Sequence, residues 1–217
     1  MPAKKYVSSS VIRRLPRYYR FLAELQKEGI NKISSGDMSA RMKLTASQIR
    51  QDLNCYGGFG QQGYGYNVSE LRREIGEIIG VEKKLKAIIV GAGNLGRAMT
   101  IHFDSSKNGC ELIGIFDINL QLEGINIAGV EVRHMSKLGA FCDKEKPEIA
   151  VLCIPKESAG TVSETLISCG VKAFWNFSSY DIHLHYDDII VENVHLADSL
   201  LTLAYSVNND KGRDDDI

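Results

Sequence analysis

Six residues from Gly91 to Gly96, with the sequence Gly-Ala-Gly-Asn-Leu-Gly, carry the clearest chemical signal in the chain. In a phosphate-binding turn Gly91 would make the tight turn, Gly93 would let a pyrophosphate approach the backbone, and Gly96 would let a helix pack closely on a sheet. The free N–H groups at the start of that helix would bind the phosphates. A glycine-rich turn of this kind also occurs on α/β domains that bind no dinucleotide. The predicted phosphate-binding residues are Gly91, Ala92, Gly93, Asn94, Leu95 and Gly96.

An acidic residue stands where a dinucleotide site needs one. Asp117 ends the next predicted strand, 21 residues after Gly96, and a carboxylate there accepts hydrogen bonds from the hydroxyls of the adenosine ribose. Because the same charge repels a 2′-phosphate, the sequence favours NAD(H) over NADP(H). An apolar pocket disfavours the positively charged ring of NAD⁺, so we expect NADH to bind more tightly. The further predicted lining residues are Ile118, Ile154, Pro155, Asn176 and Phe177.

No catalytic constellation accompanies these residues. Hydride transfer to a carbonyl usually needs a positioned acid–base group and a second lobe that encloses the substrate. The roughly 130 residues after residue 86 leave no room for that lobe beside a sheet of six or seven strands. None of the five histidines lies in a recognisable catalytic pairing, and the five cysteines include no CxxC pair for zinc or dithiol chemistry. We therefore predict a binding domain without enzymatic activity or a metal site.

A second group of polar residues lies on a predicted helix-turn-helix. Ser35 is expected to cap a short helix that ends at Met42, and Thr45 to cap a second helix that ends at Leu53. The second helix would present its N-terminal half to the major groove of DNA, where arginine can read guanine and glutamine can read adenine. A solvated helix in a protein–protein module is the alternative interpretation. The DNA contacts predicted from this pair are Lys43, Thr45, Ser47, Gln48, Arg50 and Gln51, with Lys4, Lys5 and Arg17 on phosphates.

The stretch from Tyr56 to Val68 contains five glycines interleaved with aromatic residues. This pattern suits two short strands around a flexible tip, which is the wing of a winged helix-turn-helix domain. Its predicted DNA contacts are Gly60, Gln62 and Tyr64.

The remaining elements follow from periodicity and punctuation. Ser8–Ser10 can cap a first turn and Pro16 is placed to open a helix from Arg17 to Lys27, while Asn67 begins and Gly80 ends another helix. A short joint, residues 81–86, then leads to strands 87–90 and 112–116, a polar turn, strand 149–154, helix 158–168, and strands 173–176 and 189–191. The run from Leu85 is apolar at successive positions, as in a parallel strand that is covered on both faces. We predict an α/β chain: a winged helix-turn-helix domain followed by a Rossmann domain with a doubly wound, mainly parallel sheet.

Charge divides the chain in the same way. Residues 1–86 carry 16 lysines and arginines against 8 acidic residues, a net charge of +8, whereas the rest carries 10 against 19, a net charge of −9. A basic module facing a polyanion beside an acidic one would account for this, although a chance dipole would look the same. The chain has neither an apolar signal segment nor a stretch long enough for a membrane helix, so we expect a cytoplasmic protein.

The last predicted helix, Leu196 to Val207, is apolar along two seams. Either it packs into a second subunit, giving a homodimer, or it is buried within its own domain. We place the domains at residues 1–82 (DNA binding), 83–195 (NAD(H) binding) and 196–209 (dimerisation helix), with a disordered tail at 210–217.

Taken together, these segments resemble the bacterial redox-sensing repressors of the Rex family over nearly the whole chain. The matching segments are residues 14–16, 18–22, 49–53, 63–68, 91–96, 116–117 and 176–177. The resemblance implies a homodimer with exchanged C-terminal helices that binds a palindromic operator in double-stranded DNA. It also implies repression of fermentation and respiration genes, relieved when the effector NADH binds.

The sequence departs from the family pattern at the wing tip and at two histidines. The wing tip has Gln61 and Gln62 where members often carry Lys or Arg. His102 replaces a tyrosine, and His195 replaces the aspartate that contacts the arginine matching Arg14. The predicted switch residues are therefore Arg14, His102 and His195, with Asp198 as an alternative acid; from its position alone, Arg14 fits a phosphate contact equally well.

Two other functions remain open: a small NAD-dependent oxidoreductase with a basic extension, and a nucleotide-binding protein that holds coenzyme A on a similar fold. Turnover of a carbonyl substrate would support the first. Failure of NADH to compete for the site would support the second.

Overall fold

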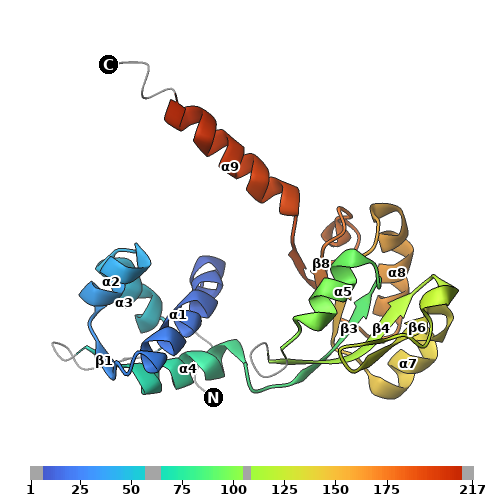
Figure 1. Cartoon of the computed structure of the whole chain (residues 1–217), viewed down its shortest axis with the longest axis horizontal. Helices are drawn as coiled ribbons and strands as arrows, with labels where there is room; N and C mark the ends of the chain where they lie inside the picture. The colour runs from blue at the N-terminus through green and yellow to red at the C-terminus, as the bar shows by residue number, and fades with distance from the viewer. Residues whose placement is uncertain (1–6, 57–64, 105–108, 212–217) are drawn as a thin grey trace. The chain divides into compact units, whose positions relative to one another are not determined.

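The computed structural model describes residues 7–56, 65–104 and 109–211, with side chains as far as residue 209. Its internal contacts group the chain into two units, Met1–Glu82 and Lys83–Ile217 (Figure 1). Each unit has its own apolar core, so each is described by itself.

The N-terminal unit is helical around one core. The long helix α1 packs along α4, and α2 packs against α3. Buried side chains from all four helices, including Leu22, Met38, Ile49 and Ile75, form this core. Its elements are α1 (Ser9–Lys27), β1 (Lys32–Ile33), α2 (Ser35–Met42), α3 (Ala46–Asn54), β2 (Tyr66–Asn67) and α4 (Val68–Ile79).

Helix α1 begins earlier than the sequence suggested. Pro16 does not open the helix but lies inside it. Ser8 is the N-cap residue, and its hydroxyl makes no capping bond to the helix backbone but shares a hydrogen bond with the hydroxyl of Ser10 at 3.0 Å. The buried stripe explains the difference, because Val11 and Leu15 continue the apolar face of Tyr18 toward the N-terminus. Burial of this stripe offsets the hydrogen bond and the steric freedom that an internal proline removes.

Polar caps fix the ends of the other helices. Ser34, not Ser35, caps α2 in a reciprocal capping box with Asp37. Thr45 caps α3 as predicted, since its hydroxyl accepts a hydrogen bond from the backbone N–H of Gln48 at 3.1 Å. Asn67 caps α4 in the same way, and Gly80 ends that helix in the left-handed conformation.

A two-stranded antiparallel sheet closes this unit. Tyr66–Asn67 pairs with Lys32–Ile33, a strand before α2 that the sequence analysis did not predict. The other strand of the predicted wing and its tip, with Gly60, Gln62 and Tyr64, lie outside the described residues. Next to the tip, Gly65 has φ +72°, and a Cβ there would lie 2.7 Å from the backbone oxygen of Ile33, so only glycine fits this approach.

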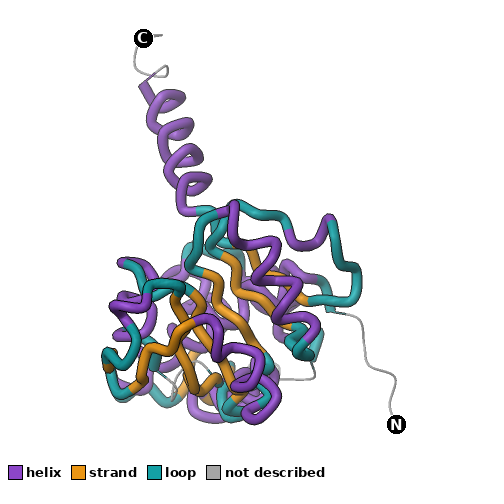
Figure 2. Tube along the Cα trace, turned by 90° about the vertical axis from the view of Figure 1, so that its right-hand side faces the viewer, coloured by secondary structure: helices purple, strands orange, loops and turns teal. Residues whose placement is uncertain are grey.

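The C-terminal unit is a seven-stranded sheet in the order β5-β6-β4-β3-β7-β8-β9. All pairings are parallel except β5 with β6, and Figure 2 shows the strands side by side with helices around them. The strands are β3 (Leu85–Val90), β4 (Cys110–Asp117), β5 (Asn126–Ile127), β6 (Val130–His134), β7 (Ile149–Leu152), β8 (Ala173–Asn176) and β9 (Ile190–Asn193). The helices are α5 (Asn94–Ile101), α7 (Leu138–Glu145), α8 (Lys156–Ser168) and α9 (Leu196–Lys211), and the 3-10 turns are η1 (Leu120–Leu122), η2 (Met135–Lys137) and η3 (Ile182–Leu184).

Two cores cover the two faces of this sheet. One contains Ile88 and Val90 of β3 with Leu138 of α7 and Leu166 of α8. The other contains Ile89 of the same strand, with Met99 of α5 packed against it. Alternate residues of β3 are therefore buried on opposite faces, which confirms the prediction of a strand covered on both sides.

The region predicted as a polar turn contains β5, β6 and α7. The hairpin of β5 and β6 is short and turns through Ala128 and Gly129, which both have positive φ. Only Leu138 and Cys142 of α7 are buried, so its apolar signal is weak. Strands and helices this short and polar leave little periodicity for the sequence analysis to detect.

Every side chain of helix α9 from Leu196 to Asn209 is exposed, so the described part of the chain does not cover this helix. Leu200, Leu201 and Leu203 are each at least 60% exposed, which contradicts burial of this helix within its own domain. The helix also reaches Lys211, so the first two residues of the predicted tail are helical. Among the described residues, no helix is both long and apolar enough to cross a membrane.

Candidate nucleotide and DNA-binding sites

The glycine turn joins β3 to α5 and requires glycine at two of its positions. Gly91 has φ +100°, and a Cβ there would lie 2.4 Å from the backbone oxygen of Cys153. A Cβ on Gly96 would lie 1.8 Å from the backbone oxygen of Gly91, so α5 can approach the turn only without a side chain. These contacts are the tight turn and the close helix–sheet packing that the motif predicts.

The middle glycine has a different environment. A Cβ on Gly93 would have no atom within 4 Å, and Gly93 and Asn94 are exposed at the start of α5. The unpaired N–H groups of the first helical turn therefore border open space, which is the arrangement that binds phosphates.

Asp117 is bound to the same turn. Its Oδ2 accepts a hydrogen bond from the backbone N–H of Ala92 at 2.6 Å, and its Oδ1 accepts one from the N–H of Asn119 at 2.8 Å. The side chain remains half-buried, and a carboxylate has further lone pairs that can accept bonds from ribose hydroxyls. The Asp117 carboxylate, at the end of β4, thus also holds the glycine turn in place through the N–H of Ala92.

The other predicted lining residues follow the carboxyl ends of neighbouring strands, as parallel topology requires. Ile118 follows β4 and is 76% exposed. After β7 come Ile154, which is half-buried, and Pro155, which is exposed and is the N-cap residue of α8. Phe177, after β8, packs at 5.0 Å from the ring of Trp175.

Asn176 differs from the rest of this set because its amide is fully engaged within the protein. Its Nδ2 donates to the backbone oxygen of Tyr180 and to Oδ1 of Asn193, each at 2.8 Å. Its Oδ1 accepts from the N–H and the hydroxyl of Ser178. Since Asn176 is also fully buried, its side chain holds the loop after β8 to β9.

On helix α3, some side chains predicted to contact DNA are exposed and others are engaged in contacts within the protein. Ser47, Arg50 and Gln51 are exposed, whereas Ile49 and Leu53 are fully buried. Arg50 donates to the hydroxyl of Ser35 at 3.0 Å across the turn from α2. On binding DNA, Arg50 would therefore leave this neutral hydroxyl and bind a base or a phosphate instead.

Two further basic residues flank this helix pair. Lys43 is exposed in the left-handed conformation at the end of α2. Arg17 donates to the backbone oxygen of Met42, which is one of the free carbonyls at the end of α2. The guanidinium predicted to bind phosphate thus stabilises the helix end.

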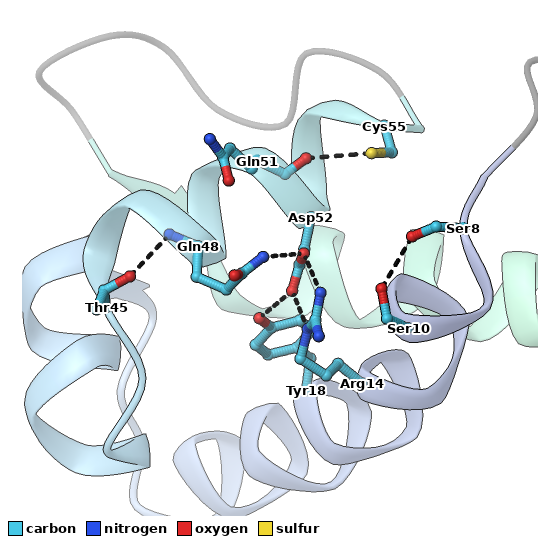
Figure 3. Close-up of polar contacts among 9 residues, drawn as sticks. All are labelled: Ser8, Ser10, Arg14, Tyr18, Thr45, Gln48, Gln51, Asp52 and Cys55. Atoms are coloured by element: carbon cyan, nitrogen blue, oxygen red, sulfur yellow. Dashed lines mark hydrogen bonds and ion pairs between the residues drawn. The ribbon is translucent and has the colours of Figure 1, made fainter.

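Asp52 is the centre of a polar cluster in this domain (Figure 3). It is fully buried and accepts four hydrogen bonds. Arg14 makes a bidentate pair with Asp52, from Nε to Oδ2 at 2.6 Å and from Nη2 to Oδ1 at 2.8 Å. The hydroxyl of Tyr18 donates to Oδ2 at 2.7 Å, and Nε2 of Gln48 donates to Oδ1 at 2.8 Å. The cluster therefore ties α3 to α1 by charge as well as by packing.

The pKa shifts in this cluster follow from its contacts. Burial raises the pKa of Asp52, but the hydrogen bonds from Arg14, Tyr18 and Gln48 more than offset it, so the pKa lies below its ordinary value. The hydrogen bond to Asp52 raises the pKa of Arg14, and burial followed by the same carboxylate raises the pKa of Tyr18. All three shifts keep a carboxylate, a guanidinium and a phenol in the folded protein.

Asp52 was absent from the predicted site. Gln48 was predicted to contact DNA, whereas its side-chain amide donates to Asp52. A signal existed in the sequence, because Asp52 shares the buried face of α3 with Ile49 and Leu53. A buried acid needs a cationic partner. The sequence left Arg14 open between a switch role and a phosphate contact, and gave no reason to pair it with Asp52.

The remaining predicted switch residues lie in the C-terminal unit. His102 is exposed and ends α5. His195 and Asp198 are exposed at the start of α9, one helical turn apart, with the N–H of Asp198 donating to the oxygen of His195 at 3.2 Å. Nothing in the described residues groups three or more metal-binding side chains.

Comparison with known proteins gives two family matches and several whole-chain relatives. Residues 6–54 match the family described as putative DNA-binding protein N-terminus, and residues 82–180 match the CoA binding domain. The redox-sensing transcriptional repressor Rex of Caldanaerobacter subterraneus subsp. tengcongensis is 51% identical over 211 residues, covering 97% of this chain and 94% of that protein.

Solved structures give the same result. The crystal structure of RSP in complex with β-NAD⁺ and operator DNA superimposes with a TM-score of 0.89 at 48% identity, covering 98% of this chain and 97% of that one. The structure of RSP in complex with β-NADH has a TM-score of 0.88 at 46% identity, covering 98% and 99%. Another structure describes RSP as a Rex-family repressor.

Proposed function

Because the chain belongs to the Rex family of redox-sensing transcriptional repressors, we propose that it binds operator DNA, binds NAD(H), and leaves the DNA when NADH binds. The NAD(H)-binding unit then acts as a sensor and not as an enzyme. The repressed genes are those of fermentation and respiration, and the protein acts in the cytoplasm.

The glycine turn is the observation that carries the nucleotide half of this proposal. Gly93 borders open space at the start of α5, and the carboxylate of Asp117 is bonded to the same turn. Phosphates would bind the helix N-terminus and the adenosine ribose would bind Asp117. The acid at this position favours NAD(H) over NADP(H). Ile118, Ile154, Pro155 and Phe177 would line the rest of the site, and Asn176 would position the last of these.

Discrimination between the two redox forms rests on charge. NADH and NAD⁺ differ by a hydride and thus by one positive charge on the nicotinamide ring. Half-buried apolar side chains such as Ile154 and Phe177 disfavour the cation, because the cation must be desolvated there.

DNA recognition uses the exposed face of α3. Ser47, Arg50 and Gln51 would contact bases, while Asp52 holds Gln48 and the helix in position. Lys43, Thr45 and the wing residues would contact phosphates.

A homodimer completes the repressor. The exposed apolar side chains of α9 require cover, and a second copy with its C-terminal helix exchanged supplies it. Two recognition helices about 34 to 36 Å apart would read an inverted repeat. NADH would favour a dimer geometry in which this spacing is lost, and a hundredfold effect requires about 2.7 kcal/mol of coupling between the sites.

The switch residues stay within this proposal. Arg14 already has a bidentate partner in Asp52, so any signal that recruits Arg14 to His195 or Asp198 must compete with that pair. If His195 takes part, His195→Ala will reduce the release of DNA by NADH. Unchanged release would favour Asp198 or His102 instead.

The deciding experiment is fluorescence anisotropy of an inverted-repeat operator duplex titrated with the protein at fixed salt, with NADH, with NAD⁺ and without nucleotide. We expect NADH alone to weaken DNA binding. Tight binding that ignores both nucleotides would refute the sensor function, and absence of DNA binding would refute the repressor function.

The match of residues 82–180 to the CoA binding domain favours coenzyme A as a second candidate ligand. Titration of NADH by its fluorescence, with coenzyme A as competitor, separates the two. If coenzyme A displaces NADH only at concentrations far above the Kd of NADH, NAD(H) is supported as the ligand.

A further inference from the structure

A pocket of about 460 Å³ lies at the opposite end of the parallel strands from the glycine turn. It is formed where α7 leads into β7 and where α8 leads into β8. Two cysteines line it, Cys142 of α7 and Cys169 at the end of α8. Neither belongs to the proposed nucleotide or DNA site.

The two cysteines differ in exposure but share one environment. Cys142 is fully buried in the core beneath α7, and Cys169 is half-buried and packs against the same core. Burial, and after it the neighbouring Cys169, raises the pKa of the Cys142 thiol to about 12. Both side chains line the same pocket and pack in the same core, so the two thiols lie close together although 27 positions separate them in the sequence.

The other three cysteines have different surroundings. Cys55 belongs to the N-terminal unit and donates to the backbone oxygen of Gln51. Cys110 and Cys153 are half-buried in the C-terminal unit, and burial raises the pKa of each thiol. Cys110 therefore provides a matched control of similar exposure in the same domain.

The pocket gives a small polar oxidant access to Cys169, which is the partly exposed member of the pair. Lys146, Lys172, Asp143 and Glu148 line it with charges of both signs. Cys169 is partly exposed at this pocket whereas Cys142 is fully buried, so Cys169 is the first target.

We propose that Cys142 and Cys169 form an oxidation-sensitive thiol pair, which hydrogen peroxide converts into a disulfide between α7 and α8. The thiolate of Cys169 attacks the peroxide, the O–O bond breaks, and Cys169 becomes a sulfenic acid while hydroxide leaves and takes up a proton to form water. The thiol of Cys142 then attacks the Cys169 sulfur. The S–S bond forms, the S–O bond breaks, and a second water molecule leaves with the proton of Cys142. The second step is slow because the buried Cys142 is rarely a thiolate.

Peptide mapping by mass spectrometry after treatment of the full-length protein with hydrogen peroxide tests this proposal. We expect a cross-linked peptide containing Cys142 and Cys169, lighter than its two parts by two hydrogens. We also expect titratable thiols in the denatured protein to fall from five to three. The disulfide will raise the Tm of the C-terminal unit, because it closes a loop of the unfolded chain.

Single cysteine variants test the proposal without relying on the cross-linked peptide alone. In Cys142→Ala, which keeps a small apolar group in the core, Cys169 will stop at the sulfenic acid and react with dimedone. In Cys169→Ala, Cys142 will stay reduced, and Cys110→Ala will leave the cross-link unchanged. Oxidation that leaves both thiols free, or that pairs either of them with another cysteine or with a second chain, would overturn the proposal.

Discussion

Replacing Asp52 with asparagine tests whether the buried cluster holds the recognition helix in place. Asparagine keeps the shape of the side chain but removes the charge and replaces one acceptor oxygen by an NH₂ group. Both Arg14 bonds and the Tyr18 bond to the fully buried carboxylate are then weakened or lost.

The expected loss in the free energy of unfolding follows from the burial of this ion pair. Removing one partner of a buried ion pair costs about 3–5 kcal/mol. Arg14 retains 26% side-chain exposure, so water can partly solvate the abandoned guanidinium, and we expect the lower end, about 3 kcal/mol. With an m-value of about 1.5 kcal/mol per molar urea, the unfolding midpoint of the N-terminal unit will fall by about 2 M.

Urea unfolding of the full-length protein can distinguish the two units. Trp175 is the one tryptophan of the chain and lies in β8, so its fluorescence reports the C-terminal unit, whereas far-UV circular dichroism reports both units. Asp52→Asn should shift part of the dichroism transition and leave the fluorescence transition unchanged.

Asp37→Asn provides the matched control, since Asp37 belongs to an exposed capping box in the same domain. Its cost should be about 1 kcal/mol or less. Equal effects of the two variants, or an Asp52→Asn protein as stable as the wild type, would refute the role assigned to this cluster.

Three further predictions follow from the same structure. Because the pKa of Asp52 is lowered in the folded state, its contribution to stability is complete above its unfolded pKa and is lost as the pH falls through the folded value; unfolding of the N-terminal unit between pH 6 and 3 will show this loss, and Asp52→Asn should abolish it. Gly96→Ala will reduce NADH affinity at least about a hundredfold and destabilise the turn, whereas Gly93→Ala will reduce affinity without lowering the Tm; titration and thermal unfolding measure both, and equal Tm losses would contradict the assigned roles. Leu200→Glu with Leu203→Glu will give a monomer by sedimentation, since both side chains are exposed on the proposed dimer helix; an unchanged dimer would place the interface elsewhere.

Much of the fold follows from signals that are local in the sequence. Thr45 and Asn67 cap helices where the sequence placed caps, because a cap depends on residues only three positions apart. The turn from Gly91 to Gly96 is recognised from six consecutive residues, and Gly96 is required by the backbone oxygen of Gly91 within the same turn.

The errors arise where distant residues decide the structure. Pro16 lies inside α1 because the buried stripe of that helix packs on α4, which begins 52 residues later at Val68. Strand Lys32–Ile33 exists because Tyr66–Asn67 pairs with it. The partner of Asp52 is 38 residues away at Arg14. No periodicity within a short window encodes such pairings.

The hydrogen bonds that the Asp117 carboxylate accepts within the protein limit how the cofactor preference can be changed. The carboxylate proposed to select against a 2′-phosphate is also the acceptor for the N–H of Ala92. A substitution that admits NADPH by removing this charge also leaves that amide without its acceptor, so binding of both cofactors falls together. Redesign toward NADP(H) therefore needs two changes at once, a cation for the added phosphate and a new neutral acceptor for the turn.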